Sequence, residues 1–388
     1  MSAVATEPLV PLFDLRLTDA DIAAVEDCLR SGWLTMGPRI AAFEDAFAEH
    51  LGVRHAVAVS SCTAALHLAY LAAGVEPGDE VIVPAITFVA TAAAVRHCGA
   101  TAVPADVVSA HDVGIDPADV ARRITPRTRA VCAVHYAGYP AAVETLDALC
   151  REHGLALVED AAHAPATRVA PDGPAAGTVG RAGAFSFFSN KVLSCGEGGL
   201  LATDDDAVAS FARSRRSHAM TSGTWDRHRG HAPGYDVEDV GFNYRLDEPR
   251  AALLLARLGG LRADVEARRR FVRRYRALLS DVPRITVPYA DEDVELSSCY
   301  VMPVLVDDAA LRDPLRAWML DRRRVQTAVL YPAIHTFAAY AGVRADGLRV
   351  SEDVAGRQLT LPLFPHMTAD QQDRVVDALC DGICVLSR

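Results

Sequence analysis

An α/β fold with a mostly parallel sheet is the fold class that this sequence predicts, on three observations. Short apolar segments alternate with segments of helical period between residues 56 and 204. Such alternation is typical of parallel strands joined by helices. Apolar residues make up 51% of the 388 and charged residues 23%, so the chain can bury a large core. That length favours two domains around a shared cleft over one small domain.

Two helices are expected before the first strand of the sheet. Residues 18–31 place apolar side chains on one helical face, and Thr18 is a suitable N-cap. A second helix is predicted over 39–51, after the loop GWLTMGPR. From residue 56 the expected strands are AVAVS, VIVP, AVCAVHY, LALVED, AFSFF and GLLATD, with helices such as TAALHLAYLA and residues 141–153 between them.

The character of the sequence changes after GFNYRLDEPR, near residue 250. Residues 248–280 predict one long helix rich in Arg and Leu, followed by the strand YVMPVLV and a last helix near 369–384. We therefore expect a large domain over residues 1–250, with an N-terminal arm, and a small domain over residues 251–388.

Charge and cysteine content exclude several classes of partner. A net charge of −11 does not favour nucleic acid or an anionic membrane. The nine cysteines include no CxxC pair, so we expect free thiols in a reducing compartment and no metal site. The start, MSAVATEPLVPLFDL, lacks the features of a signal peptide, and no apolar run has membrane-spanning length. The expected protein is soluble and cytoplasmic.

Two polar residues are expected at the ends of neighbouring strands. Asp160 ends LALVED, where α/β sheets bind ligands, and Glu159 beside it is the next candidate. Lys191 follows FSFF in a tight turn, where burial favours the neutral amine that forms a Schiff base. Taken singly, Asp160 can be read as a helix cap and Lys191 as a surface lysine. Together they match pyridoxal phosphate (PLP), which needs a lysine for its aldehyde and a carboxylate for its ring nitrogen.

A phosphate site is predicted at the start of the helix in AVAVSSCTAALHL. The free N–H groups and the dipole of a helix start attract anions. Thr63 adds a hydroxyl, and Ser61 and Cys62 are small enough for a close approach of the backbone. Phe88, just after VIVP, is placed to stack on a pyridine ring. A plain N-cap and a core phenylalanine are the alternatives at these positions.

Five motifs follow one another along the chain: SCTAALHL, VIVPAITFVATA, LVEDAAHA, FSFFSNKVLSCGEGG and GFNYRLDE. As an ordered set they resemble the DegT/DnrJ/EryC1/StrS family of sugar aminotransferases. The similarity runs from GWLTMGP to LPLFPHMT and so covers nearly the whole chain. It implies the fold type I architecture of PLP-dependent transferases, with a mostly parallel seven-stranded sheet and a smaller C-terminal α+β domain. It also implies a homodimer with shared active sites.

The resemblance implies a role for each matching residue. Lys191 matches the lysine that binds the cofactor aldehyde, and Asp160 matches the partner of the pyridine nitrogen. His163 stands where the family has Gln or His near the ring hydroxyl, and Asn243 matches an asparagine that reaches the phosphate of the neighbouring subunit. Further cofactor contacts are implied for Phe88 as the stacking aromatic, for Thr63 and Ser186 as phosphate ligands, and for the backbone of Cys62.

Substrate contacts are expected from a loop and from the small domain. Arg245 is implied to bind an anionic donor. The stretch 218–238 reads as a long polar loop, and RSH and GTWDRHRGH, between residues 215 and 231, suit a nucleotide diphosphate; a solvated loop is the alternative. A structural histidine is equally the alternative for His335. Five residues form the candidate set: Thr35, Gly37, Arg245, Tyr331 and His335.

Two departures from the family pattern stand near the predicted site. The usual SGT is SCT here, which narrows the freedom of the backbone and places the Cys62 thiol beside the phosphate. The usual PTK or ATK is Ser189-Asn190-Lys191. We expect the phosphate site to function, because the contact needs only a backbone N–H.

The expected reaction moves an amino group from an amino acid to a keto sugar, first of all a nucleotide-linked keto-deoxysugar, in amino-sugar biosynthesis. L-Glutamate is the first candidate donor and L-glutamine the second. A keto-cyclitol (inosose) acceptor with glutamine as donor is the alternative. Relatives that deoxygenate sugars carry histidine in place of the lysine, so Lys191 argues against that reaction. A non-catalytic PLP-binding regulatory protein is the remaining alternative, but the lysine is intact and no basic DNA-reading segment is present.

Overall fold

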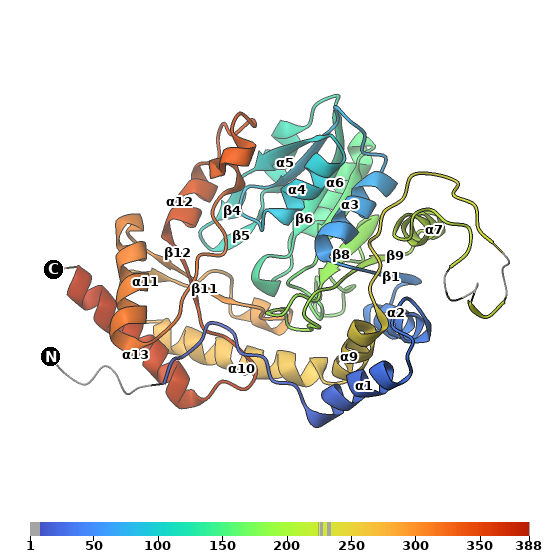
Figure 1. The fold of residues 1–388 in the computed structure, drawn as a ribbon. Helices are drawn as coiled ribbons and strands as arrows, with labels where there is room; N and C mark the ends of the chain where they lie inside the picture. The colour runs from blue at the N-terminus through green and yellow to red at the C-terminus, as the bar shows by residue number, and fades with distance from the viewer. Residues whose placement is uncertain (1–7, 224, 226–227, 231–233, 388) are drawn as a thin grey trace.

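A seven-stranded sheet forms the centre of the protein in a computed structural model, which describes residues 8–387 except 224, 226–227 and 231–233 (Figure 1). Its strand order is β1-β9-β8-β7-β6-β2-β3. Only β9 runs against its neighbours, since it is antiparallel to both β8 and β1. The mostly parallel sheet is thereby confirmed. The strands are β1 (His55–Val59), β2 (Glu80–Pro84), β3 (Thr101–Ala105), β6 (Thr128–Val134), β7 (Ala156–Asp160), β8 (Ala182–Ser186) and β9 (Gly199–Thr203).

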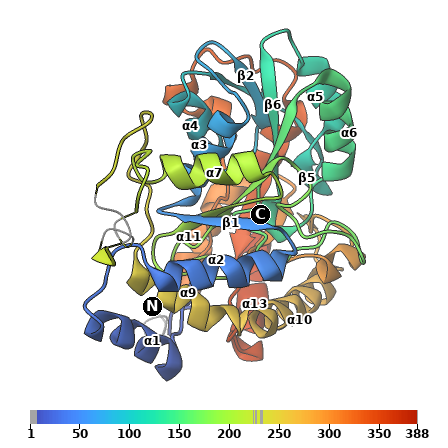
Figure 2. The same ribbon diagram turned by 90° about the vertical axis from the view of Figure 1, so that its right-hand side faces the viewer.

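Helices cover both faces of this sheet, which explains why its strands are near-continuous apolar runs. In β2, Val81 and Val83 pack with one set of helices, whereas Ile82 between them packs with the other. Figure 2 shows α7 and α2 on opposite sides of β1. The first set is α3 (Cys62–Ala72), α4 (Ala90–His97) and α7 (Asp206–Arg215); the second includes α5 (Pro117–Arg123) and α6 (Val143–His153), and α2 (Pro38–Leu51) covers the β1 end.

A second, antiparallel sheet of three strands is built from the C-terminal part of the chain. The N-terminal segment contacts this C-terminal part of the chain, because Val10 forms an isolated bridge with Val325. A short hairpin of β4 (Val107–Ser109) and β5 (Asp112–Ile115) lies apart from both sheets. The domain boundary near residue 250 remains a prediction. The second sheet consists of β10 (Ile285–Thr286), β11 (Met302–Val306) and β12 (Gln358–Leu361), with helices α11 (Ala309–Arg323), α12 (Arg349–Arg357) and α13 (Ala369–Leu386) around it.

The single helix predicted over residues 248–280 is wrong. The structure has two helices, α9 (Glu248–Leu258) and α10 (Leu261–Leu279), separated by Gly259 and Gly260. Each glycine costs about 1 kcal/mol in a helix interior, so two in succession end α9 despite the apolar period on either side. The first helix agrees with its prediction: α1 (Asp19–Arg30) begins at a capping box formed by Thr18.

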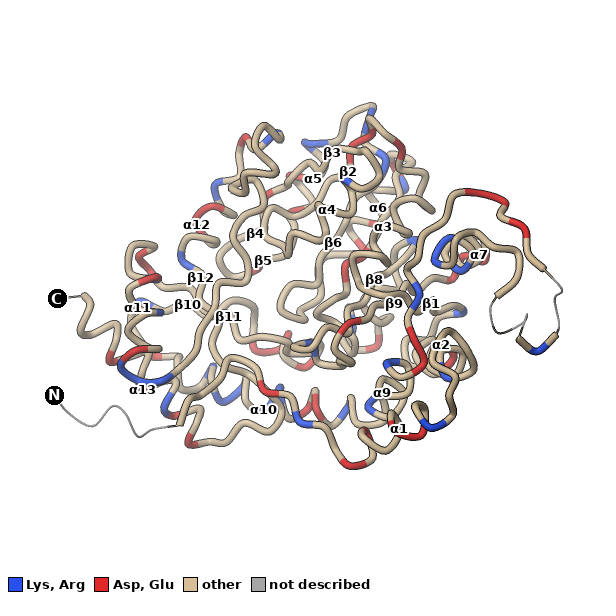
Figure 3. Tube along the Cα trace, in the orientation of Figure 1, with Lys and Arg blue, Asp and Glu red and all other residues tan. Residues whose placement is uncertain are grey.

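Charge is mixed over the outside of the molecule. Acidic residues predominate in α1 and arginines in α10, whereas α11 carries both (Figure 3). Over the described part of the chain, no helix is both long enough and apolar enough to span a bilayer.

Candidate active site

A cavity of about 380 Å³ lies at the carboxyl ends of the parallel strands. Ligands bind at this edge in open α/β sheets. Residues from the ends of β6, β7 and β8 line it, together with the segments that follow β1 and β2 and two tyrosines from the C-terminal part. The structure therefore brings eight of the predicted residues together: Cys62, Thr63, Phe88, Asp160, His163, Ser186, Lys191 and Tyr331.

Lys191 extends its amine into this cavity from the turn after β8. The turn is held by the Lys191 N–H, which donates to the carbonyl of Phe188 at 2.8 Å. The amine lies 4.3 Å from the ring centroid of Tyr300, and in the described part of the chain it makes no hydrogen bond. Burial lowers the pKa of Lys191 to about 8, while the negative charge of Asp160 acts in the opposite direction. About a tenth of this amine is therefore neutral, and nucleophilic, at pH 7, far more than for an ordinary lysine.

Asp160 ends β7 and is buried with only 5% of its surface exposed. Its Oδ2 accepts a hydrogen bond of 2.7 Å from the Thr91 hydroxyl, and its Oδ1 accepts one of 3.1 Å from the N–H of Ala162. Burial raises the pKa of Asp160, while these two donors and Lys191 act in the opposite direction. The carboxylate also lines the cavity, so it has an acceptor side that faces a ligand.

Glu159, the alternative carboxylate, serves a structural purpose on the other face of the sheet. Successive side chains of a strand point to opposite faces, so Glu159 cannot share the cavity with Asp160. Its oxygens accept from His135 at 2.9 Å and from three backbone N–H groups at 2.7–2.8 Å, of Gly177, Val179 and Gly180. Burial would raise the pKa of Glu159, but the hydrogen bonds from His135, Gly180 and Gly177 lower it.

An anion-binding end is formed by the start of α3. The first N–H groups of a helix have no partner within it, so those of Cys62 and Thr63 are available to a phosphate. Ser61 caps the helix, since its side chain accepts from the N–H of Ala64 at 3.2 Å. Gly199 lies directly behind, where a Cβ would overlap the backbone of Ser61 and Cys62.

The thiol of Cys62 lies close to Asp160, since its Sγ is 3.9 Å from Oδ1 of that carboxylate. Its expected place beside the phosphate stays a prediction. Burial, followed by the charge of Asp160, raises the pKa of this thiol well above its usual value. Cys62 therefore contributes its backbone N–H to the anion-binding end and an uncharged thiol to the surroundings of Asp160.

His163 is neutral and fixed in one tautomer. Its Nδ1 accepts from the N–H of Ala137 at 3.2 Å, so the proton is on Nε2, which lies 3.1 Å from the Tyr331 hydroxyl. Burial, with the charges of Lys191 and His135, lowers the pKa of His163 well below its usual value. The ring stacks on Tyr300 at 4.3 Å. Phe88, which also lines the cavity, is 53% exposed, and its ring lies 5.5 Å from that of Tyr331.

Other predicted residues lie outside this cavity. Asn243 and Thr35 are exposed, and His335 lies 3.3 Å from a carboxylate oxygen of Glu352. The contact with Glu352 agrees with the alternative of a structural histidine at position 335. Gly37 and Arg245 line a different cavity. Of the predicted loop motif, Thr224, Asp226, Arg227 and His231 lie outside the described residues.

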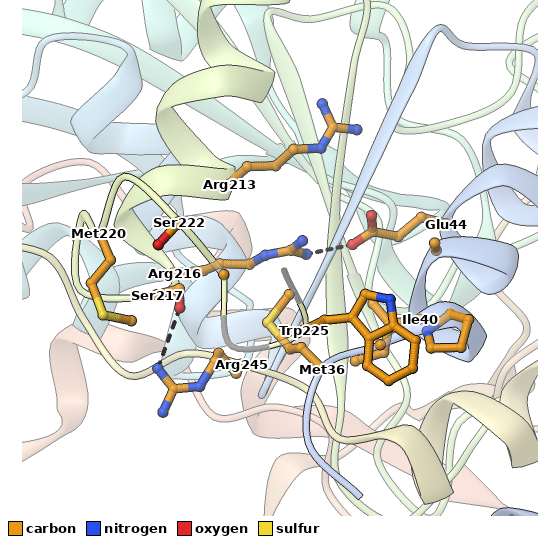
Figure 4. Close-up of a pocket in the computed structure, with 14 residues that line it drawn as sticks. Met36, Ile40, Glu44, Arg213, Arg216, Ser217, Met220, Ser222, Trp225 and Arg245 are labelled. Carbon is orange, nitrogen blue, oxygen red and sulfur yellow. Dashed lines mark hydrogen bonds and ion pairs between the residues drawn. The ribbon is translucent and has the colours of Figure 1, made fainter. Parts of the chain in front are cut away.

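This second cavity, of about 470 Å³, is lined by arginines and an aromatic ring (Figure 4). Arg216 is held by Glu44 and by the carbonyl of Ala58 at 2.7 Å. Arg213 and Arg245 are tethered more weakly, each by one hydrogen bond of 3.4 Å. The Trp33 ring packs against Trp225 and His228, both at 4.6 Å, which joins the GWLTMGP loop to the long polar loop.

Three residues in or next to the Lys191 cavity were missed by the sequence reasoning: Thr87, Thr91 and Tyr300. Thr91 contacts Asp160; its position four residues after Thr87, on one face of a helix start, was an available signal. Tyr300 packs under the Lys191 amine and donates to Oδ1 of Asn190 at 3.0 Å. No local pattern reveals Tyr300, because its contact spans more than a hundred residues of chain.

The residues present fit pyridoxal phosphate. A partly neutral amine is available for an aldehyde, and Asp160 offers an acceptor side to a ring N–H. Thr63, Ser186 and the start of α3 supply donors for a phosphate. These three chemistries surround one cavity of about 380 Å³, which is within the range of cofactor sites.

Comparison with known proteins gives long matches. The model of the DegT/DnrJ/EryC1/StrS aminotransferase family matches residues 16–380. The spore coat polysaccharide biosynthesis protein SpsC of Bacillus subtilis (strain 168) is 36% identical over 367 residues, which are 93% of this chain and 94% of that protein. The crystal structure of S. venezuelae DesV in complex with a ketimine intermediate is 36% identical, with a TM-score of 0.87, and covers 97% of this chain and 98% of its own.

A further solved structure agrees. DesI, crystallised in the presence of its TDP-sugar product, is 33% identical with a TM-score of 0.86, over 99% of this chain and 94% of its own. These matches span both sheets and the cavity between the strand ends and Tyr331. The chain therefore belongs to the DegT/DnrJ/EryC1/StrS aminotransferase family, whose members are PLP-dependent enzymes of fold type I.

Proposed function

We propose that this aminotransferase moves an amino group from an amino acid, first of all L-glutamate, to a nucleotide-linked keto sugar in amino-sugar biosynthesis. The observation that carries the reaction type is the pairing of a desolvated Lys191 amine with Asp160 in one cavity. The TDP-sugar product of DesI and the polysaccharide role of SpsC support a sugar acceptor. The nine cysteines are all free, which supports the reducing cytoplasm as the place of action.

In this proposal each residue of the cavity has one task. Bound pyridoxal phosphate supplies an aldehyde for an amine and a ring that accepts electrons from the substrate carbon. Lys191, with its pKa near 8, removes and returns a proton at that carbon, because it titrates close to neutral pH. Asp160 holds the proton on the ring nitrogen. Neutral His163 offers one N–H and no charge, so it leaves the charge of the site to Asp160 and Lys191.

We also propose a homodimer in which Asn243 completes the partner's site. Phe242 and Tyr244 stack at 4.8 Å, and His67 of α3 packs on Phe242 at 4.9 Å. Since side chains of an extended segment alternate, Asn243 between them points away from its own α3. Its exposed amide is thus directed outward, away from the cavity of its own chain, which supports the role implied by the family resemblance.

The arginine-lined cavity is proposed to receive the nucleotide diphosphate. Glu44 neutralises Arg216, which leaves Arg213 and Arg245 for phosphates, while the indole of Trp225 offers a surface for a base (Figure 4). Arg245 follows Asn243 by two residues and shares no cavity with Lys191 of its own chain. In the proposed dimer this cavity therefore serves the partner's Lys191.

The chemical assignment is tested by trapping the cofactor. Borohydride reduction of the yellow, PLP-loaded protein should fix the cofactor to the peptide that contains Lys191, and Lys191→Ala should bind PLP without turnover. Peptide mapping by mass spectrometry reads the result. Label on another lysine would contradict the assignment.

The acceptor is tested by competition between substrate classes. The protein is first charged with glutamate or with glutamine, and the cofactor spectrum reports which donor works. Nucleotide-linked keto sugars and an inosose are then offered, and mass spectrometry detects the amine. Amination of the inosose alone would favour the cyclitol alternative, and no spectral response to either amino acid would favour a non-catalytic protein.

A further inference from the structure

Behind Asp160 lies a pair of buried hydroxyl groups that the proposed reaction does not use. Thr91 has no exposed surface and Thr87 has 1%. Thr87 Oγ1 and Thr91 Oγ1 are 2.7 Å apart, and Thr91 Oγ1 is 2.7 Å from Oδ2 of Asp160. Three oxygen atoms of three side chains thus form a chain of two short hydrogen bonds that ends on the carboxylate.

The direction of these hydrogen bonds is fixed. A hydroxyl has one proton to donate. Thr91 donates its proton to Asp160, so in the other bond Thr87 must be the donor and Thr91 the acceptor. A hydroxyl that accepts a hydrogen bond becomes a stronger donor, so Thr87 strengthens the contact of Thr91 with the carboxylate.

The backbone holds both hydroxyls in place. Thr87 follows Ile86, which forms a bridge with Ala333, and Thr91 lies in the first turn of α4. The carbonyl of Thr91 accepts from the Tyr70 hydroxyl at 3.2 Å. On the opposite side, Oδ1 of Asp160 is held by the N–H of Ala162 and faces the Cys62 thiol. Both oxygens therefore accept hydrogen bonds, which is the pattern of an ionised carboxylate.

We propose that Thr91, oriented by Thr87, is a positioning residue that keeps Asp160 ionised and aimed into the Lys191 cavity. The inference rests on the proposed function, because the group that Asp160 is aimed at is the ring nitrogen of pyridoxal phosphate. It goes further by assigning two threonines of the segment PAITFVATA to the control of that carboxylate. Thr91 does not line the cavity, so removing its hydroxyl changes the surroundings of Asp160 without removing a cavity-lining group.

The test compares two ligands that differ only at the ring nitrogen. Thr91→Val should weaken the affinity for pyridoxal phosphate about tenfold, the size of one hydrogen bond to a charged group. Its affinity for 1-deaza-pyridoxal phosphate should stay unchanged, because a C–H in place of the nitrogen makes no demand on Asp160. Thr91→Ser should restore the wild-type values. Thr87→Val should act in the same direction by about threefold.

A matched control separates this effect from lost stability. Thr203 is also a buried threonine with a hydrogen-bonded hydroxyl, which donates to the carbonyl of Arg181 at 2.7 Å, far from the Lys191 cavity. Thr203→Val should leave both affinities unchanged. If Thr91→Val does not fold, Thr87→Val carries the same comparison. Equal losses for both ligands, or no loss for either, would overturn the inference.

A measurement without cofactor separates this inference from the proposed function. Carbon-13 NMR of protein labelled at aspartate carboxyls follows the titration of Asp160 in the free chain. Thr91→Val should raise the pKa of Asp160 above that of the wild type, since one donor to the ionised form is lost, while Lys191, Cys62 and His135 remain. An unchanged pKa overturns the role of Thr91 even if transfer proceeds. A raised pKa in a protein that does not bind PLP upholds the contact while the proposed function fails.

Discussion

The two cavities of this chain differ in how their charged groups are balanced. In the Lys191 cavity the amine has no hydrogen-bond partner among the described residues, and Asp160 keeps an open side. In the arginine-lined cavity Arg216 is bound by Glu44 before any ligand arrives. The first therefore holds groups whose protonation can change, whereas the second holds permanent charges that are partly neutralised. In the proposed function, that difference separates the cavity that performs chemistry from the cavity that recognises the nucleotide.

The largest expected effect on the Lys191 cavity comes from replacing Asp160. Asp160→Asn should retain PLP but lose turnover on the order of 10³-fold, because an uncharged amide no longer favours a proton on the ring nitrogen. Steady-state rates and the cofactor spectrum measure the two properties separately. Near-normal turnover would show that the chemistry does not depend on an ionised group at this position.

In the arginine-lined cavity, removing the charge of Glu44 should lower the stability of the fold rather than the rate of the reaction. Glu44→Gln leaves Arg216 buried without its counter-ion and should lower the free energy of unfolding by about 3 kcal/mol. Urea denaturation measures this loss. Glu49→Gln, an exposed position on the same helix, is the control and should change little. If Glu44→Gln abolished turnover in a stable protein, the division between the cavities would fail.

Asn243 tests whether the second region serves the partner's cofactor. Asn243→Ala should weaken PLP binding by about 2 kcal/mol, the contribution of a hydrogen bond to a charged group. Mixing Lys191→Ala with Asn243→Ala subunits should restore activity, because a mixed dimer has one site with both lesions and one with neither. A diluted monomer that keeps its PLP and its full activity is the contrary outcome.

The smallest expected effect concerns the pH dependence of Lys191. Burial lowers the pKa of this amine to about 8, so its neutral fraction rises about tenfold from pH 6 to 7 and levels off above pH 8. The rate at which cofactor-free protein captures PLP should follow this fraction. An ordinary lysine, with a pKa near 10.4, would still gain rate well above pH 9. Stopped-flow absorbance between pH 6 and 10 distinguishes the two profiles.

Local patterns were sufficient where one segment determines its own structure. Thr18 identified the start of α1, and the apolar run before Asp160 identified β7. The helix break at Gly259-Gly260 was missed, although the two glycines were visible, because the apolar period continues through them. Strand β3 was also missed, since TAVPA contains a proline that is tolerated at the edge of the sheet.

Contacts between distant segments were beyond local patterns. The opposite roles of Glu159 and Asp160 follow from strand alternation, but only the fold shows that one face is closed by Gly177 and Gly180 and the other is open. Tyr300 lies just before β11 and packs against the Lys191 amine. No spacing in the sequence predicts this contact. The motif residues were found because one family keeps them in one order, which supplies the long-range information that periodicity lacks.

The position of β1 at the edge of the sheet has a consequence for synthesis of the chain. In the described structure β1 pairs only with β9, whose residues follow some 140 positions later. Helix α3, whose start is the predicted phosphate site, begins shortly after β1, and Gly199 packs against its first turn. A nascent chain that has not yet released residues 199–203 from the ribosome thus has no strand on which to dock β1. Completion of the anion-binding end therefore has to wait for β9, which emerges after Asp160 and Lys191.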